Sequence, residues 1–162
     1  KKRILSLALS AAMALTMLPT GAFAASDKGK PPVYNKATGC YEISTPDQLL
    51  YLSGSWRDGA PRDGHYVLTA DIDMTGVKGF SDASKKDQGF TGTFDGQFHA
   101  IKGLRVEYEK KYAGLFGYVG NQDDQAYIKD VALLDCYVTG QQNVGALAGV
   151  NYGTITGCVV TG

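Results

Sequence analysis

Two carboxylates, Asp71 and Asp73, are the residues best placed by sequence to bind a metal ion. They lie two positions apart in an alternating segment, so on a strand they would point to the same side. Such a pair could bind calcium, but calcium takes six or more oxygen ligands. Few further candidates are near, among them Asp82 and Asp95. We expect a solvent-facing polar row, with Asp71 and Asp73 as weak metal candidates, and no cofactor.

A second possible site is the group Asp95, His99 and Lys102, whose side chains could transfer protons in a carbohydrate-cleaving groove. Asp95, however, begins a tight turn signal with Gly96, and His99 and Lys102 have opposite parity on a strand. The chain has no His-Glu-x-x-His motif of a metalloprotease either. We predict no catalytic residue in the chain and keep an enzyme as the alternative.

The three cysteines, Cys40, Cys136 and Cys158, are widely spaced and form no C-x-x-C or Cys/His cluster, so we expect no zinc site. An exported chain could oxidise a pair of them. Cys136 and Cys158 occupy the same place in a repeated segment, where parallel Cβ vectors would give a disulfide poor geometry. We predict stacked, apolar free thiols.

Tyrosines could supply flat rings with a polar tip to a glycan or protein ligand. The outer packing of strands uses the same residue type, so both interpretations stay open. The tyrosines concerned are Tyr108, Tyr112, Tyr118, Tyr127, Tyr137 and Tyr152.

The elements that must position these residues belong to a turn-rich chain with 21 Gly and 10 Tyr and few helix-favouring runs. Residues 1–24 hold three of the 16 basic residues and no acidic residue, so the remainder carries 13 basic against 16 acidic residues. No basic run is present that could follow phosphates, and we expect no nucleic-acid partner.

Residues 1–24 have the features of a cleavable secretory signal peptide. Three basic residues precede an uncharged stretch over 4–18, and the small residues Ala22 and Ala24 fit cleavage after Ala24. The apolar stretch is shorter than the roughly 20 residues that span a bilayer. We predict an exported, extracellular protein without membrane insertion after cleavage, and a polar leader over 25–38.

Residues 39–89 are predicted to form an N-terminal capping region with one short helix and the first strands. Thr45 is a helix N-cap, Pro46 suits the first helical position, and Gln48 completes a capping box. We expect a helix of about ten residues from this signal. One strand is predicted at 40–43 and a second over all of 65–73, with its buried side made by Tyr66, Leu68, Ala70 and Ile72.

Residues 90–162 consist of short strand-like segments between Gly turns and contain an internal repeat. AGLFG at 113–117 is similar to GALAG at 145–149, and DCYVTG at 135–140 is similar to GCVVTG at 157–162. Such units cannot fold alone, but stacked units bury a shared apolar stripe. This predicts an all-β parallel β-helix over 90–162, after a short N-terminal capping helix. An antiparallel β-sandwich is the alternative.

Small residues are expected to hold this stack together, because Gly permits positive φ and close approach of backbones. A phosphate-binding role would need a helix N-terminus behind the loop, and none follows. The predicted structural repeat residues are Gly114, Leu115, Gly117, Leu147, Gly149, Gly153, Cys136 and Cys158.

Segments 92–104, 113–119 and 143–149 resemble the GLUG-repeat family, and the lead-in over 42–53 and 66–76 is similar as well. The resemblance covers roughly 41–162. It implies a right-handed β-helix in an extracellular setting, as in bacterial surface and secreted proteins, adhesin-like chains and the N-terminal parts of immunoglobulin A1-type metalloproteases. It implies no single activity.

We therefore expect a non-catalytic secreted or cell-surface module, adhesin-like or a stalk. No capping element follows the last repeat strand, which predicts an N-terminal fragment of a larger bacterial protein. Its expected partners are a host glycan or protein and further β-helix coils of the same chain. The alternative is the N-terminal region of a secreted enzyme, either an immunoglobulin A1-type metalloprotease or a carbohydrate-active β-helix enzyme.

Overall fold

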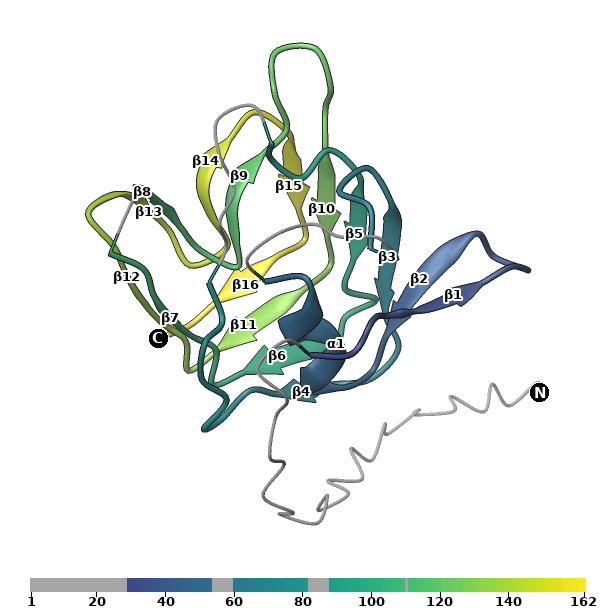
Figure 1. Ribbon diagram of the computed structural model, residues 1–162, viewed down its shortest axis with the longest axis horizontal. Helices are drawn as coiled ribbons and strands as arrows, with labels where there is room; N and C mark the ends of the chain where they lie inside the picture. The colour runs from purple at the N-terminus through teal and green to yellow at the C-terminus, as the bar shows by residue number, and fades with distance from the viewer. Residues whose placement is uncertain (1–28, 54–59, 82–87, 110) are drawn as a thin grey trace, which may run out of the picture.

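The computed structural model of the chain describes residues 29–53, 60–81, 88–109 and 111–162 (Figure 1). This part of the protein consists almost entirely of short strands, with one short helix. The prediction of an all-β fold is therefore confirmed. The predicted signal peptide, residues 1–24, lies outside the described residues.

The strands of the described part are two to four residues long. In chain order the elements are β1 (Val33–Asn35), β2 (Cys40–Ile43), α1 (Pro46–Tyr51), β3 (His65–Leu68), β4 (Ile72–Asp73), β5 (Thr93–Asp95), β6 (Ala100–Lys102), β7 (Arg105–Glu107), β8 (Lys111–Ala113), β9 (Phe116–Val119), β10 (Tyr127–Lys129), β11 (Ala132–Leu134), β12 (Tyr137–Thr139), β13 (Gln142–Val144), β14 (Ala148–Asn151), β15 (Thr154–Thr156) and β16 (Val159–Val160).

Helix α1 begins with the predicted capping box. The Thr45 hydroxyl accepts a hydrogen bond from the Gln48 backbone N–H, and the Gln48 side chain accepts one from the Thr45 N–H at 3.2 Å. The helix has six residues, fewer than predicted, because Leu52 already acts as its C-cap. Leu49 and Leu50 are buried in the core, so this short helix is held by tertiary packing.

Strands that are far apart in sequence lie side by side in a fixed order (Figure 1). One sheet has the order β1-β2-β3-β5-β10-β15 and a second the order β16-β11-β6-β4, and three further pairs are β12-β7, β13-β8 and β14-β9. Strands β5 to β9 visit these five sheets in turn, β10 to β14 visit them again in the same order, and β15 and β16 begin a third round. We call these rounds the first, second and third circuits.

The circuits pair in parallel and in register. Tyr127 lies opposite Thr93 on one side and opposite Thr154 on the other. The number of residues from Thr93 to Tyr127 differs from the number from Tyr127 to Thr154, because loops of different length connect equivalent strands. Within the described residues the single antiparallel strand pair is β1 with β2, so the tight hairpins of the alternative β-sandwich do not connect the other strands.

The prediction of one continuous strand over 65–73 is wrong. Strand β3 ends at Leu68, and the chain turns before β4, which belongs to a different sheet. The N–H of Thr69 donates to the Ile43 carbonyl at 3.0 Å at this corner. Alternating burial continues across the corner, since Leu68 and Ile72 are both buried. Strands β2 to β4 also join the sheets of the later circuits, so no break in the sheets separates 39–89 from 90–162.

Several corners between strands repeat at equivalent positions with positive φ. Asp130 (φ 53°) precedes Gly157 (φ 63°) by one circuit, and Gly103 (φ 67°) precedes Asp135 (φ 51°) in the same way. Left-handed backbone suits Gly and is tolerated by Asp and Asn. The residue types at the corners therefore match the conformation that the turn requires.

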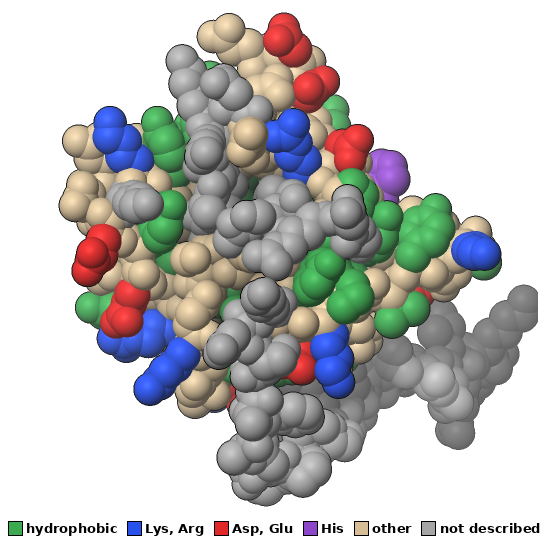
Figure 2. Space-filling view, in the orientation of Figure 1, with side chains coloured by type: hydrophobic (Ala, Val, Ile, Leu, Met, Phe, Trp, Pro, Cys, Tyr) green, Lys and Arg blue, Asp and Glu red, His purple; other side chains and the backbone are tan. Residues whose placement is uncertain are grey.

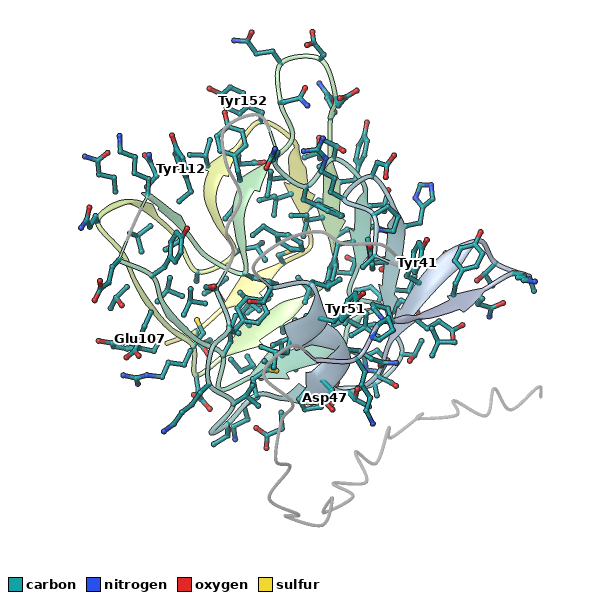
Figure 3. All side chains as sticks on the ribbon, viewed as in Figure 1. Tyr41, Asp47, Tyr51, Glu107, Tyr112 and Tyr152 are labelled. Carbon is teal, nitrogen blue, oxygen red and sulfur yellow. The ribbon has the colours of Figure 1, made fainter. Side chains whose placement is uncertain are left out.

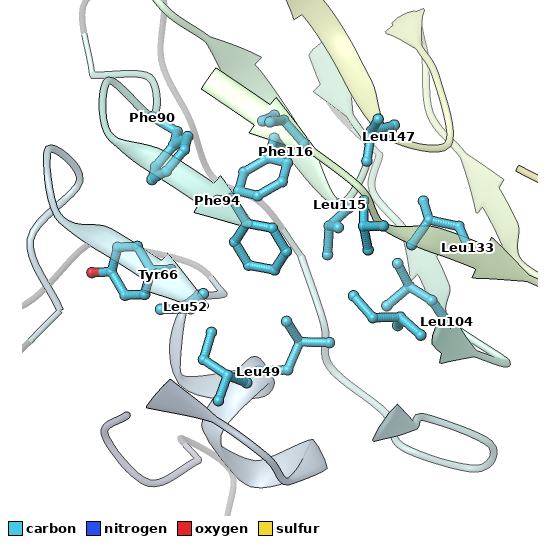
Figure 4. Close-up of a cluster of buried hydrophobic side chains, with 14 of the residues drawn as sticks. Leu49, Leu52, Tyr66, Phe90, Phe94, Leu104, Leu115, Phe116, Leu133 and Leu147 are labelled. Carbon is cyan, nitrogen blue, oxygen red and sulfur yellow. The ribbon is translucent and has the colours of Figure 1, made fainter. Parts of the chain in front are cut away.

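Buried side chains from each sheet meet in one core (Figure 4). Tyr66, Phe94 and Ile128 are direct partners on successive strands, and all three are fully buried. The rings of Phe90 and Phe116 stack beside them with centroids 5.0 Å apart. Burying one such side chain contributes about 1.5–3 kcal/mol, so the aligned columns are the main source of stability.

One end of the stack of circuits is uncovered. Strands β12, β13, β14, β15 and β16 each lie at the end of their sheet order, with a hydrogen-bonded strand on one side only among the described residues. We call the free sides of these five strands the open edge. Side chains next to it are less buried than their partners one circuit earlier: Leu133 is fully buried, whereas its partner Val160 is 46% exposed.

Candidate functional site

The predicted carboxylate pair is engaged by protein donors. Oδ1 of Asp71 accepts a hydrogen bond from the Ala100 N–H at 2.9 Å and lies 3.0 Å from Nδ1 of His99. These donors, the Ala100 N–H above all, lower the pKa of the Asp71 carboxyl group. Oδ1 of Asp73 accepts from the Thr75 N–H at 2.9 Å, and hydrogen bonds from Thr75 lower the pKa of Asp73.

The structure does not bring the weak candidates for calcium ligands together. Asp95 lies in another turn, where its Oδ2 pairs with Nζ of Lys129 at 2.9 Å, and Asp82 lies outside the described residues. In residues 29–53, 60–81, 88–109 and 111–162, no three His, Cys, Asp or Glu side chains lie close enough together to hold a metal ion. Asp73 instead stabilises a local turn at Thr75, and Asp71 links its segment to the distant residues His99 and Ala100.

Asp95, His99 and Lys102 do not form one cluster either. Each pairs with a residue from a neighbouring segment: Asp95 with Lys129, His99 with Asp71, and Lys102 with Asp135 at 3.8 Å. Hydrogen bonding to Asp95 raises the pKa of Lys129. The three residues thus bridge different strands and share no reacting centre.

The repeat glycines permit close packing of backbones. A Cβ on Gly114 would lie 2.6 Å from the Gly145 carbonyl oxygen, and one on Gly153 would lie 2.4 Å from the Ala126 carbonyl oxygen. A Cβ on Gly149 would lie 2.7 Å from the carbonyl oxygen of Gly117, one circuit earlier. Gly114, Gly149 and Gly153 do not adopt positive φ, so that part of their predicted role is wrong. Close approach alone accounts for them.

Leu115 and Leu147 occupy equivalent places on consecutive circuits. The Phe116 N–H donates to the Leu147 carbonyl at 2.9 Å, and Phe116 lies opposite Ala148. Both leucines are buried, Leu147 least so because it adjoins the open edge. This pairing follows the similarity of AGLFG to GALAG in the sequence.

The predicted stacking of Cys136 on Cys158 is wrong. All three cysteines are free, but the register of β11 with β16 brings Cys158 beside Val131, whose carbonyl accepts from the Val159 N–H at 3.0 Å. Cys136 falls beside Leu104, since Tyr137 lies opposite Arg105. The similarity of 135–140 to 157–162 thus joins strands of different sheets.

The tyrosines divide into two groups. Tyr127, Tyr137 and Tyr152 are about half-exposed, whereas Tyr118 is buried, so packing is the interpretation that holds for Tyr118. Tyr118 packs between Tyr112 and Tyr152, with ring centroids 5.4 and 5.7 Å away. Figure 3 shows Tyr112 and Tyr152 near each other, on a different side of the molecule from Glu107. Tyr108 is half-buried against the core.

A hollow beside β7 and β12 is the best candidate binding site, and the sequence analysis missed it. Arg105 Nε donates to Oε1 of Glu107 at 2.9 Å, and the Arg105 guanidinium lies 4.4 Å from the centroid of the Tyr137 ring. The neighbouring open hollow has a volume of about 460 Å³ and is lined by Glu107, Tyr108, Glu109, Thr139, Gly140 and Gln141.

The chemistry of this face suits a polar, uncharged ligand. Carboxylates, a hydroxyl and an amide can bind sugar hydroxyls, and the exposed Tyr137 ring can pack on an apolar ring face. The alternation of Arg105, Glu107 and Glu109 with Val106 and Tyr108 was the available sequence signal. Among the described residues, Figure 2 shows acidic and basic side chains interspersed on the face that it draws, with no continuous basic stripe that would suit phosphates.

No family model and no solved structure matches the chain. The chain is 32% identical to Halomucin of Haloquadratum walsbyi over 133 residues, which cover 75% of this chain and 1% of Halomucin. It is 31% identical to a protein of Evansella cellulosilytica named as a Gly-rich membrane protein, over 100 residues that cover 56% of this chain and 11% of that protein. The chain thus spans a small fraction of the length of these relatives. The helix in the described part is too short to cross a membrane.

Proposed function

We propose that the chain is a non-catalytic module of an exported or cell-surface protein, built as a right-handed parallel β-helix. It serves as a stalk that presents an adhesin-like binding face. The observation that carries the proposal is the repeated order of parallel strands: two circuits visit the same five sheets in the same sequence and a third begins.

The register of the circuits supports the β-helix. Each of the first two circuits supplies one strand to every sheet, and all circuits surround the same core. Parallel strands joined by a crossover are right-handed in about 98% of proteins, which agrees with the hand that the GLUG resemblance implies. The equivalent places of Leu115 and Leu147 support GLUG-type repeats as the unit of stacking.

An extracellular location is supported by two independent features. The segment 1–24 carries a basic start, an apolar stretch and small side chains at the expected cleavage point. One relative is named as a membrane protein, and this chain matches 11% of it. Both relatives extend far beyond the matched segment, which fits a module within a longer chain.

The binding face of the module is the surface formed by Arg105, Glu107 and Tyr137 with the adjoining hollow. Arg105 is already fixed by Glu107 and by the Tyr137 ring, so little side-chain freedom remains to be lost on binding. A glycan or a protein loop would fit this face. The separate pairing of Asp95, His99 and Lys102 supports a role without catalysis.

Binding to a glycan array tests this proposal, and the matched variants are Tyr137→Ala and Tyr127→Ala. Both rings are half-exposed, but Tyr127 belongs to a different sheet. We expect Tyr137→Ala to weaken the strongest signals by about 30-fold, as for an interface hot spot, and Tyr127→Ala to leave them unchanged. Equal losses in both variants, or no glycan or protein ligand at all, would contradict the binding role.

Export is tested separately. Residues 1–32 placed before a reporter enzyme that is active only outside the cytoplasm should give activity and a mature N-terminus at Ala25. Leu9→Arg within the apolar stretch should abolish both. No reporter activity, with the uncleaved fusion protein in the cytoplasmic fraction, would rule out the proposed location.

A further inference from the structure

The turn between β5 and β6 is longer than the equivalent turns of the later circuits. Four residues, 96–99, connect these strands in the first circuit, whereas two residues, 130–131 and then 157–158, connect their partners in the second and third circuits. The strands on both sides of the three turns are aligned in parallel register. A two-residue turn therefore suffices to close this corner, and stacking does not require the two additional residues of turn 96–99.

The longer turn holds an aromatic side chain in solvent. Phe98 is 85% exposed, the largest exposed fraction of any large hydrophobic side chain in the described part of the chain. Gln97 and Phe98 both have left-handed backbone, with φ of 47° and 62°. This conformation suits Gly, Asn and Asp and is unfavourable for a bulky side chain. Since an exposed ring also contributes nothing to the core, the fold itself gives no reason for phenylalanine at this position.

Hydrogen bonds fix turn 96–99 between its neighbours. The Phe98 N–H donates to the Asp130 carbonyl at 2.8 Å, and the His99 N–H donates to the Gly96 carbonyl at 2.8 Å within the turn. On the other side, Nδ1 of His99 lies 3.0 Å from Oδ1 of Asp71. Residues that are held in an unfavourable backbone conformation by their surroundings are concentrated at binding sites. A ring on such a fixed turn also loses little freedom when a ligand binds.

We propose that turn 96–99 is a second binding site of the module and that its ligand is a neutral glycan. The C–H face of a sugar ring packs on the Phe98 ring. The sugar hydroxyls bind the exposed side chains of Gln97 and Asp71, of which the Asp71 side chain is 74% exposed. The site goes beyond the proposed function, because Phe98 precedes β6, whereas the face that includes Tyr137 lies on the strands that follow β6 and β11.

The charges around the turn favour an uncharged ligand. Asp95 pairs with Lys129 at 2.9 Å, which leaves the carboxyl groups of Asp71 and Asp130 beside the turn. Hydrogen bonds lower the pKa of Asp71, so this group is ionised at neutral pH. Even with His99 protonated, carboxylates outnumber cations here. Carboxylate, sulfate or phosphate groups on a ligand would therefore be repelled.

A protein partner or a lipid surface fits the turn less well. The core of a protein interface is an apolar patch, whereas Phe98 is the one exposed large hydrophobic side chain within 95–102. Anionic lipid surfaces attract basic segments, and this corner has an excess of acidic groups. A single ring among exposed polar groups matches a sugar, which has both an apolar face and hydroxyls.

A glycan array probed with the Tyr137→Ala chain tests the proposal, because this background removes binding at the face beside β7 and β12. We expect remaining signals on neutral glycans, at least about tenfold stronger than on their carboxylated or sulfated counterparts. Adding Phe98→Gly should weaken these signals by about tenfold or more, as for the loss of an aromatic anchor. Adding Phe98→Trp should retain them. Tyr34→Ala, which removes a half-exposed ring on β1, is the matched control and should leave them unchanged.

Thermal melting separates binding from folding. Phe98→Gly should melt no lower than the parent chain, because glycine adopts left-handed backbone without strain. Phe98→Asn also tolerates this conformation and should lose binding to the same extent. Loss of binding in Phe98→Gly together with a lowered Tm, but retained binding in Phe98→Asn, would show a structural role and overturn the proposal.

Other outcomes would overturn the proposal as well. They are unchanged neutral-glycan signals in both Phe98→Gly and Phe98→Asn, equal or stronger binding of anionic glycans, and Phe98-dependent retention on phosphatidylcholine vesicles. None of them bears on Tyr137. A loss of ligand binding that depends on Tyr137 alone would leave the proposed function standing while the second site fails.

Discussion

Ile128 and Ile155 are direct partners on the neighbouring parallel strands β10 and β15, yet Ile128 is fully buried and Ile155 is only half-buried. The two positions have the same side chain, the same strand direction and the same inward orientation. They differ in their neighbours. Strand β10, which holds Ile128, lies between β5 and β15, whereas β15, which holds Ile155, has β10 on one side and the open edge on the other.

This difference predicts unequal costs for the same substitution. Ile128→Ala should lower the free energy of unfolding by about 2–5 kcal/mol, because it leaves a cavity inside the core. Ile155→Ala should cost less than half as much, because solvent already reaches part of that side chain. Urea denaturation of the two variants measures both values. Equal costs would show that the open edge is covered in solution.

The corner at Asp135 allows a test of backbone conformation. Its φ of 51° disfavours a β-branched residue, so Asp135→Val should destabilise the chain by about 1–2 kcal/mol. Asp135→Gly is the matched control and should be close to neutral, because the lost pair with Lys102 is long and exposed. A valine variant as stable as the glycine variant would contradict the corner geometry.

The lowered pKa of the Asp71 carboxyl group predicts that this group stabilises the fold in a pH-dependent way. Its folded-state pKa is lowered, so its contribution is present above the unfolded-state pKa and is lost as pH falls through the folded-state pKa. Asp71→Asn should cost at most about 1 kcal/mol at pH 7, since the side chain is largely exposed. The difference from wild type should shrink below roughly pH 4.

A second substitution identifies the donor responsible. His99→Gln keeps the Ala100 N–H that is the main cause of the Asp71 shift, so most of the pH dependence should remain. Thermal melting between pH 2 and pH 7 records both variants. If Asp71→Asn destabilises equally at all these pH values, the carboxylate makes no such contribution.

Local hydrogen-bond patterns were predictable from sequence. The capping box of Thr45 and Gln48 depends on four adjacent residues, and the structure contains it. Alternation also identified Tyr66, Leu68 and Ile72 as buried residues of segment 65–73, but Ala70 is only half-buried and the segment is two strands. The corner between β3 and β4 could not be predicted from the hydrophobic pattern, because burial alternates across it without a break. The two strands are distinguished only by their long-range partners, which belong to different sheets.

The register between circuits was only partly predictable. The similarity of 113–117 to 145–149 coincides with the pairing of β9 with β14, where small residues are needed for close approach. The similarity of 135–140 to 157–162 does not coincide with a strand pairing. Each segment begins with a residue of positive φ, Asp135 or Gly157, and continues as a strand, but the two strands belong to different sheets. The binding face was missed because Arg105 and Tyr137 meet only through the register of β7 with β12.

The central claim is that consecutive circuits stack in parallel with the register described here, and spin-label pairs test it most directly. In a chain without cysteines, labels at Tyr127→Cys and Thr154→Cys would lie on exposed, directly paired positions, with backbones about 4.8 Å apart. Labels at Tyr137→Cys and Val159→Cys are the matched control: both are exposed and have a similar separation along the chain, but they belong to different sheets. We predict strong dipolar broadening of the electron paramagnetic resonance spectrum for the first pair and much weaker broadening for the second. No broadening between positions 127 and 154, or stronger broadening between 137 and 159, would contradict the stacked arrangement.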